Sequence, residues 1–217
     1  MAFLQLFYMA VLLRIRNQVI YPKTKNKYGK YWSSIWFNKN TQIIKEIETA
    51  NDEVAVCAQF ETLIGKLIVY GTIIAYKDFL IKEGSQPWEE HYKSIKWHGE
   101  DWFNIISGNP NVPFVVAGDF NQTRDGSNRY STSEGINLLG TLLEKCNLEC
   151  VTEENFTETG KLNADPNKGY PRANIDHICI SKNFFNSIEV GAWDHFNDER
   201  NYTSDHNGVF IDLYKLN

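Results

Sequence analysis

The sequence lacks any stretch that is long and apolar enough to cross a lipid bilayer. Its most apolar run, residues 2–13, spans twelve residues, whereas a transmembrane helix needs about 20. Two arginines, Arg14 and Arg16, follow the run instead of preceding it, and no small-residue cleavage site is visible, so the order is not that of a signal peptide. We therefore expect residues 2–13 to be buried in a globular protein, with no membrane span.

Cysteine pairs and an excess of positive charge are also missing. The four cysteines form no Cys-x-x-Cys pair and no zinc-ligand spacing, and two of them, Cys57 and Cys179, lie in apolar runs typical of core residues. This usage fits a reducing, cytoplasmic compartment. The net charge of −5 argues against a protein that coats nucleic acid by bulk electrostatics, and no basic stripe is visible, although a local basic cleft is compatible with it.

The remaining composition is that of an ordinary globular protein. The chain has 217 residues, of which 42% are hydrophobic and 14% aromatic, with no internal repeat or low-complexity segment. We expect one domain over residues 1–217, in which residues 1–30 are atypical or truncated, and we expect a monomer.

The first half of the chain reads as a meander of antiparallel strands over residues 31–75. A basic, turn-like linker, residues 21–30, leads into an aromatic strand at 31–37. Residues 41–47 fit a short helix or a strand equally well. Strands at 54–60 and 66–74, joined by residues 61–65, predict a hairpin.

Helical patterns interrupt the strands further along. Apolar residues recur at helical spacing between Trp88 and Ile106, after a start signal at Ser85 and Pro87, and Gly99 could divide this helix in two. A second helix, residues 134–146, has Ser133 as its expected cap. Further strands are predicted at residues 114–117, 148–151, 174–181, 188–193 and 208–213, with a long polar loop at 152–172. The pattern predicts a mixed α/β protein with two packed sheets and helices outside.

The predicted buried strand at 114–117 ends in Gly118-Asp119-Phe120-Asn121. In an extended chain, Asp119 and Asn121 would point to the same side and project together from the end of the strand. A plain turn is an alternative, because Gly, Asp and Asn all favour turns.

Two polar clusters follow in the C-terminal third. Asp176 stands near the start of the predicted strand 174–181, and Ser204-Asp205-His206 precedes the last strand. Each cluster alone has an ordinary explanation as an ion pair or a turn cap. Together, and in this order, Gly-Asp-Phe-Asn, Ile-Asp-His-Ile and Ser-Asp-His resemble the motifs of the endonuclease/exonuclease/phosphatase superfamily. The resemblance implies a four-layer α/β sandwich like that of deoxyribonuclease I, with loops around a divalent-metal phosphoesterase site.

The resemblance also implies roles for five residues. Asp119 would orient or deprotonate the attacking water and contact a metal, and Asn121 would bind the phosphoryl oxygen or orient Asp119. His206 would donate to a phosphate oxygen, and Asp176 would hold it in its protonated form. Asp205 would be a ligand for Mg²⁺ or Mn²⁺, which prefer carboxylate oxygen.

Arg124, Arg172 and Asn174 lie beside the motifs and are candidates for substrate binding, although loop arginines are more often solvated charges. We interpret His177 as a packing residue, because its side chain should point away from that of Asp176.

The sequence departs from the family pattern in its first half. The family places an Asn in its first strand and a metal-binding Glu in the next, and nothing before residue 60 matches; Leu6 stands where the Glu would follow Phe3-Leu4-Gln5. Ile73 occupies the position where the family usually has a His or Tyr. Either the chain starts late, without its first strands, or it is a divergent member with a depleted metal site.

The leading hypothesis is therefore a Mg²⁺- or Mn²⁺-dependent phosphoesterase that hydrolyses phosphodiester bonds, with DNA or RNA as substrate. The alternatives are a catalytically impaired relative that acts as a binding module, and a phosphatase acting on a small or lipid phosphate.

Overall fold

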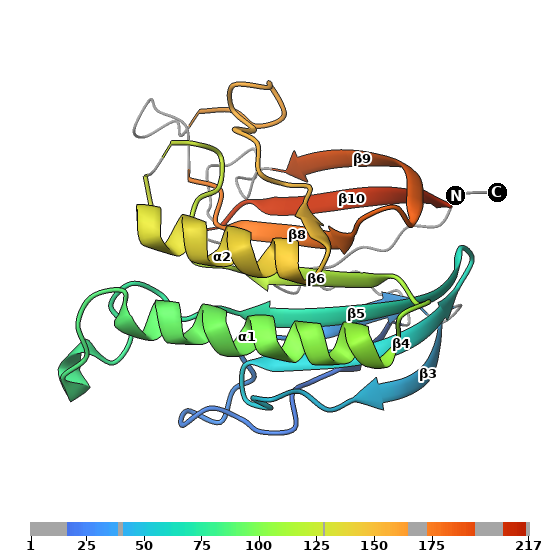
Figure 1. Ribbon diagram of the computed structural model, residues 1–217, viewed down its shortest axis with the longest axis horizontal. Coiled ribbons are helices and arrows are strands. Elements are labelled where there is room, and N and C mark those ends of the chain that lie inside the picture. The colour runs from blue at the N-terminus through green and yellow to red at the C-terminus, as the bar shows by residue number, and fades with distance from the viewer. Residues whose placement is uncertain (1–16, 39–40, 128, 165–172, 194–205, 216–217) are drawn as a thin grey trace.

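A six-stranded mixed sheet forms the centre of the protein in the computed structural model, which describes residues 17–38, 41–127, 129–164, 173–193 and 206–215. The strand order is β3-β4-β5-β6-β8-β7 (Figure 1). Only β5 and β6 run parallel; the other neighbours are antiparallel. The strands are β3 (Gln42–Ile47), β4 (Ala55–Thr62), β5 (Gly65–Ile73), β6 (Phe114–Asp119), β7 (Leu148–Cys150) and β8 (Asp176–Ser181).

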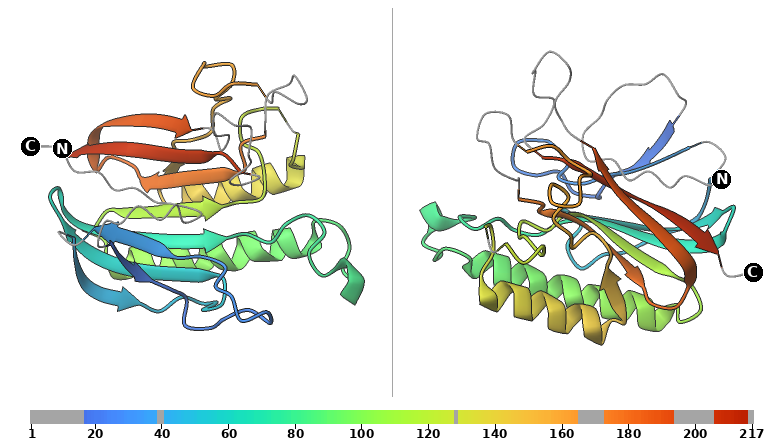
Figure 2. Two further views of the ribbon diagram at one scale, coloured as in Figure 1. Left: turned by 180° about the vertical axis from the view of Figure 1, so that it is seen from behind. Right: turned by 90° about the horizontal axis from the view of Figure 1, so that it is seen from above.

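The two faces of this sheet are covered differently. Helices α1 (Glu89–Gly108) and α2 (Ser133–Lys145) lie side by side on one face, and a 3-10 turn, η1 (Ile81–Glu83), precedes them (Figure 1). Two separate antiparallel pairs lie on the other face (Figure 2). These pairs are β1 (Asn17–Ile20) with β2 (Ile35–Asn38), and β9 (Phe185–Trp193) with β10 (Gly208–Lys215).

Three layers are therefore present in the described ranges: helices, the six-stranded sheet, and the strand pairs. The second helical layer of a four-layer sandwich stays a prediction, and the apolar residues 2–13 lie outside the described residues. No helix in the described part of the chain combines the length and apolar character needed to cross a membrane.

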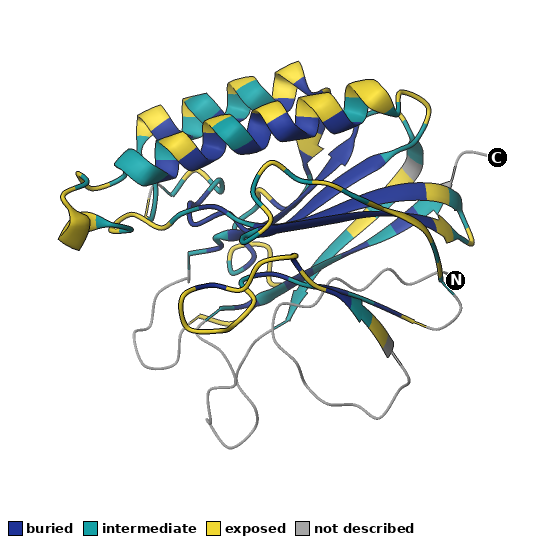
Figure 3. Ribbon diagram, turned by 90° about the horizontal axis from the view of Figure 1, so that it is seen from below, coloured by how far each residue is buried: buried dark blue, intermediate teal, exposed yellow. Residues whose placement is uncertain are grey.

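The central strands are buried on both faces. In β6, Phe114 and Val116 pack into the core beneath the helices, whereas Val115 and Ala117 pack into the core shared with the strand pairs. This two-sided burial explains why the strand reads as a continuous apolar run instead of an alternating one. The inner sides of the helices and the central strands are accordingly dark blue in Figure 3. Cys57 and Cys179 are confirmed as members of the helix-side core.

Several predicted elements differ in detail. Residues 42–47 form a strand, and the meander is confirmed for β3, β4 and β5, but β2 begins only at Ile35 and pairs with β1 instead. Helix α1 runs unbroken through Gly99, where a Cβ atom would lie 2.7 Å from Leu142 of α2. This glycine therefore permits the close packing of the two helices and does not end one of them.

Both predicted helix caps were also misplaced. Trp88, not Ser85, precedes α1, and the Ser85 hydroxyl binds the carboxylate of Glu90 instead. The cap of α2 is Thr132, whose Oγ1 accepts a hydrogen bond from the backbone N–H of Gly135. A one-residue shift of this kind is common, because neighbouring Ser and Thr side chains both suit the position.

The parallel contact between β5 and β6 is exceptionally close at Gly118. This residue has φ +150°, and a Cβ atom placed on it would lie 1.8 Å from the carbonyl oxygen of Thr72. A glycine is required here because no side chain fits between the two backbones. The end of β6 that carries Asp119 thereby reaches its position next to β5.

We expect Gly118→Ala to lower the free energy of unfolding by about 3 kcal/mol, because the strands must separate to admit the methyl group. The control is Gly140→Ala in the interior of α2, where nothing lies within 4 Å of the added Cβ and where Ala should stabilise by about 0.5–1 kcal/mol. Denaturant unfolding of both variants measures the difference, and equal effects would contradict this account of Gly118.

A buried polar cluster joins α1 to β5. The imidazole of His98 is fully buried, with Nδ1 3.1 Å from the Tyr70 hydroxyl and Nε2 2.9 Å from Thr72 Oγ1. The Tyr70 hydroxyl donates to the carboxylate of Asp101 over 2.7 Å. Burial lowers the pKa of His98 to about 3, because a charged imidazole would lose its hydration there.

This lowered pKa predicts a pH dependence of stability. Between the ordinary value of 6.5 and about 3, unfolded His98 binds a proton that the folded form does not bind, so acidification favours unfolding. Wild type should therefore lose up to about 1.4 kcal/mol per pH unit more than His98→Gln between pH 6 and 4. Denaturant unfolding across this range provides the measurement. Parallel pH profiles for the two proteins would contradict the prediction.

Candidate active site

Two carboxylates face each other across neighbouring strands at one end of the central sheet. Asp119 of β6 is in register with Asp176 of β8, and the next pair is joined by a hydrogen bond from the Phe120 N–H to the Ile175 carbonyl. Asp119 and Asp176 therefore form a non-hydrogen-bonded pair, the kind in which opposite side chains approach most closely. Both side chains follow the parity of Ala117 and so point towards the layer of strand pairs.

The proximity of two acids in a buried place changes the protonation of Asp119. Burial, followed by the negative charge of Asp176, raises the pKa of Asp119 to about 7. Asn121 partly offsets this rise. Its backbone N–H donates to Asp119 Oδ1 over 2.8 Å, and its Nδ2 donates to Oδ2 over 2.9 Å. The two hydrogen bonds from Asn121 also fix the orientation of the Asp119 carboxyl group.

The contact between Asp119 and Asn121 arises differently from the sequence prediction. Strand β6 ends at Asp119, and Asn121 has a left-handed backbone, with φ 49°. The two side chains thus meet through a turn and not through an extended chain, so the turn interpretation describes the backbone correctly. A second hydrogen bond, from Asn121 Nδ2 to the Ile74 carbonyl, ties this turn to the end of β5.

His206 reaches the pair from the segment just before β10. Its Nδ1 lies 2.7 Å from Oδ2 of Asp176, within hydrogen-bond distance, so the carboxylate fixes the orientation of the ring. Strand β10 belongs to the layer of strand pairs, whereas Asp176 belongs to the central sheet. The site is therefore built between two layers.

Three of these side chains have the geometry of a cation site. One ligand atom each from Asp119, Asp176 and His206 lies within 4.8 Å of the others. The Oδ1 atom of Asp176 is buried without a hydrogen-bond partner among the described residues, a costly arrangement unless a cation or donor approaches it. Two buried carboxylates and an unsatisfied oxygen suit a hard divalent ion. Asp205, the predicted metal ligand, lies outside the described residues.

A cavity opens beside Asp176. Its lining includes Ser33 and Ser34 ahead of β2, and Asn207 ahead of β10. Sequence reasoning missed these three residues, because serine and asparagine before a strand are ordinary turn residues. Ile73, which stands where the family usually has a His or Tyr, lies in register with Asp119 on the neighbouring strand. An apolar side chain therefore stands next to the carboxylate.

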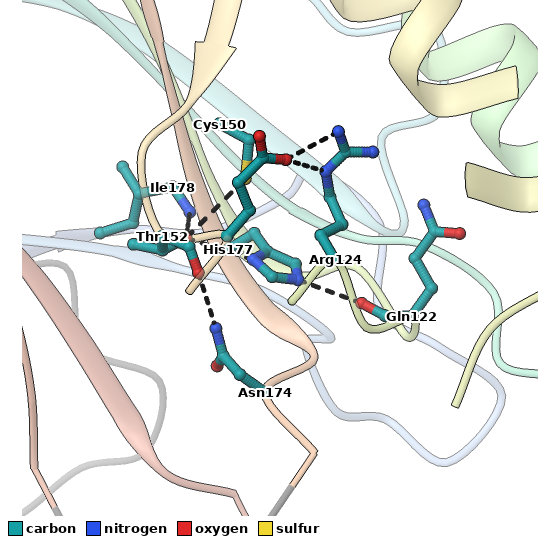
Figure 4. A network of polar contacts seen from close by, with 8 residues as sticks. Gln122, Arg124, Cys150, Thr152, Asn174, His177 and Ile178 are labelled. Atoms are coloured by element: carbon teal, nitrogen blue, oxygen red, sulfur yellow. Dashed lines mark hydrogen bonds and ion pairs between the residues drawn. The ribbon is translucent and has the colours of Figure 1, made fainter. Parts of the chain in front are cut away.

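The predicted substrate-binding residues make protein contacts in the structure. The guanidinium of Arg124 pairs with Glu153 over 2.8 Å, and its side chain is only 11% exposed. Asn174 Nδ2 donates to the backbone carbonyl of Thr152 over 3.0 Å (Figure 4). Substrate contact by these two residues stays a prediction, and Arg172 lies outside the described residues.

His177 belongs to a buried network behind the site (Figure 4). Thr152 Oγ1 accepts from the Ile178 N–H over 2.9 Å and lies 3.2 Å from Nδ1 of His177, while Nε2 lies 3.1 Å from the Gln122 carbonyl. A neutral ring with its proton on Nε2 satisfies all of these contacts at once. The packing interpretation of His177 is confirmed, and the ring also locates the loop that follows Asn121.

Thr152→Val should test this network, because it keeps the shape of the side chain and removes only the hydroxyl. The Ile178 N–H and the His177 ring would then be buried with a partner missing, which should cost about 1–3 kcal/mol of unfolding free energy. Thr141→Val, at an exposed site on α2, should change stability by less than about 0.5 kcal/mol. Thermal and denaturant unfolding would compare them, and a silent Thr152→Val would exclude a stabilising role.

The fold and this site define a class of protein: an α/β scaffold with paired carboxylates and an imidazole at the end of a mixed sheet. A family model described as the Endonuclease/Exonuclease/phosphatase family matches residues 23–206. The chain therefore belongs to the endonuclease/exonuclease/phosphatase family, as its motifs predicted. None of the curated proteins with which it was compared matches the sequence.

Solved structures support the same fold at low sequence identity. The human Nocturnin catalytic domain with bound sulfate is 16% identical, with a TM-score of 0.56 over 91% of this chain and 72% of that one. The endonuclease domain of TRAS1, a telomere-specific non-LTR retrotransposon, is 16% identical, with a TM-score of 0.59 over 91% and 80%. D. rerio TDP2 in complex with a single-strand DNA product is 14% identical, with a TM-score of 0.58 over 92% and 77%.

Proposed function

We propose that this protein is a divalent-metal-dependent phosphodiesterase that hydrolyses phosphodiester bonds in nucleic acid. The observation that carries the proposal is the assembly of Asp119, Asp176 and His206, with the 2.7 Å contact between His206 and Asp176. Hydrolysis of a phosphodiester needs a group that accepts a proton from water and a donor that meets the phosphate oxygens. This site combines both.

Each residue has a distinct task in the proposed reaction. Asp119, a buried carboxyl group at the end of β6, orients the attacking water and accepts its proton. Asn121 holds the Asp119 carboxylate through two hydrogen bonds. Asp176 binds Nδ1 of His206 and favours the imidazolium, so that Nε2 can donate to a phosphate oxygen.

Mg²⁺ or Mn²⁺ is the proposed cofactor. Asp119 and Asp176 would hold the ion through carboxylate oxygens, and Asp205 is the further ligand expected from the sequence. The bound ion would neutralise charge on the phosphate and polarise it towards attack.

The substrate assignment rests on likeness to relatives whose names identify them as nucleases or as DNA-bound. These include the TRAS1 endonuclease domain, the Neisseria meningitidis 3'-5' exonuclease and the DNA-product complex of TDP2. A phosphatase acting on a small phosphate is the second candidate, because a mannosyl-6-phosphatase from Bacteroides thetaiotaomicron shares the fold with a TM-score of 0.54. The four buried free thiols are consistent with the cytoplasmic location that we propose.

Cleavage of a labelled DNA or RNA oligonucleotide in Mg²⁺ or EDTA tests the proposal. Wild type should cleave only with the metal, and His206→Ala and Asp119→Asn should each lower the rate by about 100-fold or more. Glu149→Gln, an exposed carboxylate on β7, should leave the rate unchanged. The enzyme assignment fails if wild type shows no metal-dependent cleavage above that of His206→Ala.

A thermal-shift titration separates metal binding from catalysis. Mg²⁺ or Mn²⁺ should raise the melting temperature of wild type, because binding to the folded state stabilises it. Asp119→Asn should reduce this shift, whereas Glu149→Gln should preserve it. An inactive protein that still shows the shift would indicate a non-catalytic binding module, and release of phosphate from a small phosphomonoester without oligonucleotide cleavage would indicate the phosphatase.

A further inference from the structure

The acidic net charge of the protein conceals a strongly basic N-terminal segment. Eight of the 22 lysines and arginines fall within the first 45 residues, and no Asp or Glu precedes Glu46. Residues 21–31, the first part of the connection between β1 and β2, belong to this segment and are called the basic loop below. Its lysines, all exposed, are Lys23, Lys25, Lys27 and Lys30. This separation along the sequence concentrates positive charge in the loop in spite of the net charge of −5, while Glu46, Glu48 and Asp52 act on Lys23.

Three tyrosines are interleaved with these lysines and face solvent. Tyr28 is 70% exposed, and Tyr21 and Tyr31, which are 40% and 39% exposed, stack on each other at 4.4 Å between ring centroids. Lys25 Nζ lies 5.2 Å from the centroid of the Tyr31 ring, and Lys27 Nζ lies 5.4 Å from that of Tyr28. Cations and flat aromatic faces are therefore presented together.

The basic loop is held in a defined shape. Asn26 is buried, and its Oδ1 accepts hydrogen bonds from the backbone N–H groups of Tyr28 and Lys30. Gly29 takes the left-handed backbone conformation that the turn needs, with φ +74°, and its N–H donates to the Asn26 carbonyl. The exposed Tyr28 ring at the tip is thus carried by a hydrogen-bonded turn, which reduces the entropy lost when a ligand binds.

Two hydrogen bonds fix the chain at and just beyond the basic loop to residues immediately ahead of β4. The chain then continues to the cavity beside Asp176. The Thr24 N–H donates to the Asp52 carbonyl over 3.0 Å, and the Ser33 hydroxyl donates to the Val54 carbonyl over 3.0 Å. Ser33 and Ser34, two and three residues beyond Tyr31, line the cavity beside Asp176. A polymer bound along the loop therefore has a short path to the carboxylates.

Most of the positive charge of the loop is not neutralised within the protein. Lys23 forms an ion pair with Glu48 over 2.8 Å. Among the residues that the structure describes, no acidic group lies within ion-pair distance of Lys25, Lys27 or Lys30. These three ammonium groups are available to an anionic partner.

We propose that the basic loop binds single-stranded nucleic acid and guides it to the active site. The inference rests on the proposed phosphodiesterase function and names the substrate class. Lysines meet the phosphates, and unpaired bases stack on Tyr28 and on the Tyr21–Tyr31 pair, the combination that single-strand binding sites use. A duplex hides its base faces and cannot stack in this way. An anionic membrane fits less well, because residues 21–31 contain no Leu, Ile, Phe or Trp to insert.

Fluorescence anisotropy with a labelled single-stranded oligonucleotide of twelve thymidines tests the proposal. The titration is done in EDTA, so that binding is measured without metal-dependent cleavage. The variant Lys25→Ala/Lys27→Ala/Lys30→Ala should bind more weakly, and its slope of log K against log salt should be shallower by about 2. Tyr28→Ala should weaken binding about fivefold or more and leave the salt slope unchanged.

Matched variants remove the same groups elsewhere. Lys66→Ala/Lys82→Ala/Lys96→Ala takes three exposed lysines from β5, η1 and α1. Phe103→Ala removes a 40% exposed aromatic ring of α1 that also has a lysine, Lys145, 4.6 Å from its centroid. Both should bind the oligonucleotide within about twofold of wild type, since the salt-dependent contacts and the stacking rings remain. Thermal unfolding of every variant verifies that each protein is folded.

The outcomes separate this inference from the proposed function. Loss of binding in the loop variants alone supports the basic loop; equal loss in loop and control variants, or no loss in either, overturns it. Tighter binding to the duplex, or to phosphatidylserine vesicles in place of the oligonucleotide, also overturns it. Oligonucleotide binding without cleavage in Mg²⁺ refutes the phosphodiesterase alone, whereas cleavage by wild type with unchanged binding by the loop variants refutes the loop alone.

Discussion

The register between β6 and β8 is the constraint on which the site depends. It places Asp119 directly opposite Asp176, in a pair whose side chains approach closely. A slip of β6 by one residue would turn Asp119 towards the helices and away from Asp176. Gly118 supports the same arrangement from the other side, because only glycine allows β5 to lie against β6 at this point.

The burial of Asp119 next to Asp176 is unfavourable for the stability of the folded protein. Two buried carboxylates repel each other, and this repulsion adds to the effect of burial on the pKa of Asp119. Hydrogen bonds from Asn121 and the contact with His206 offset part of the cost. Perturbed carboxyl groups of this kind are typical of functional sites, because stability alone would not select them.

The surroundings divide into rigid support and exposed contact surface. On the helix side, His177 and Thr152 contact each other in a buried network, and His98 joins α1 to β5. On the solvent side, the basic loop exposes Tyr28 and its lysines around a turn fixed by Asn26. The buried network positions the catalytic side chains, and the exposed basic loop can select the ligand that reaches them.

The sequence by itself determined most strands of the central sheet, the two helices and the motif residues, because local hydrophobic period and turn chemistry are written in neighbouring residues; it did not predict β1. It also identified Asp119, Asp176 and His206 through their motifs. Only the tertiary structure decided that β2 pairs with β1, that Asn121 meets Asp119 through a left-handed turn, and that Ser33 approaches the site. These features depend on contacts between distant segments, whose free energy no local pattern encodes.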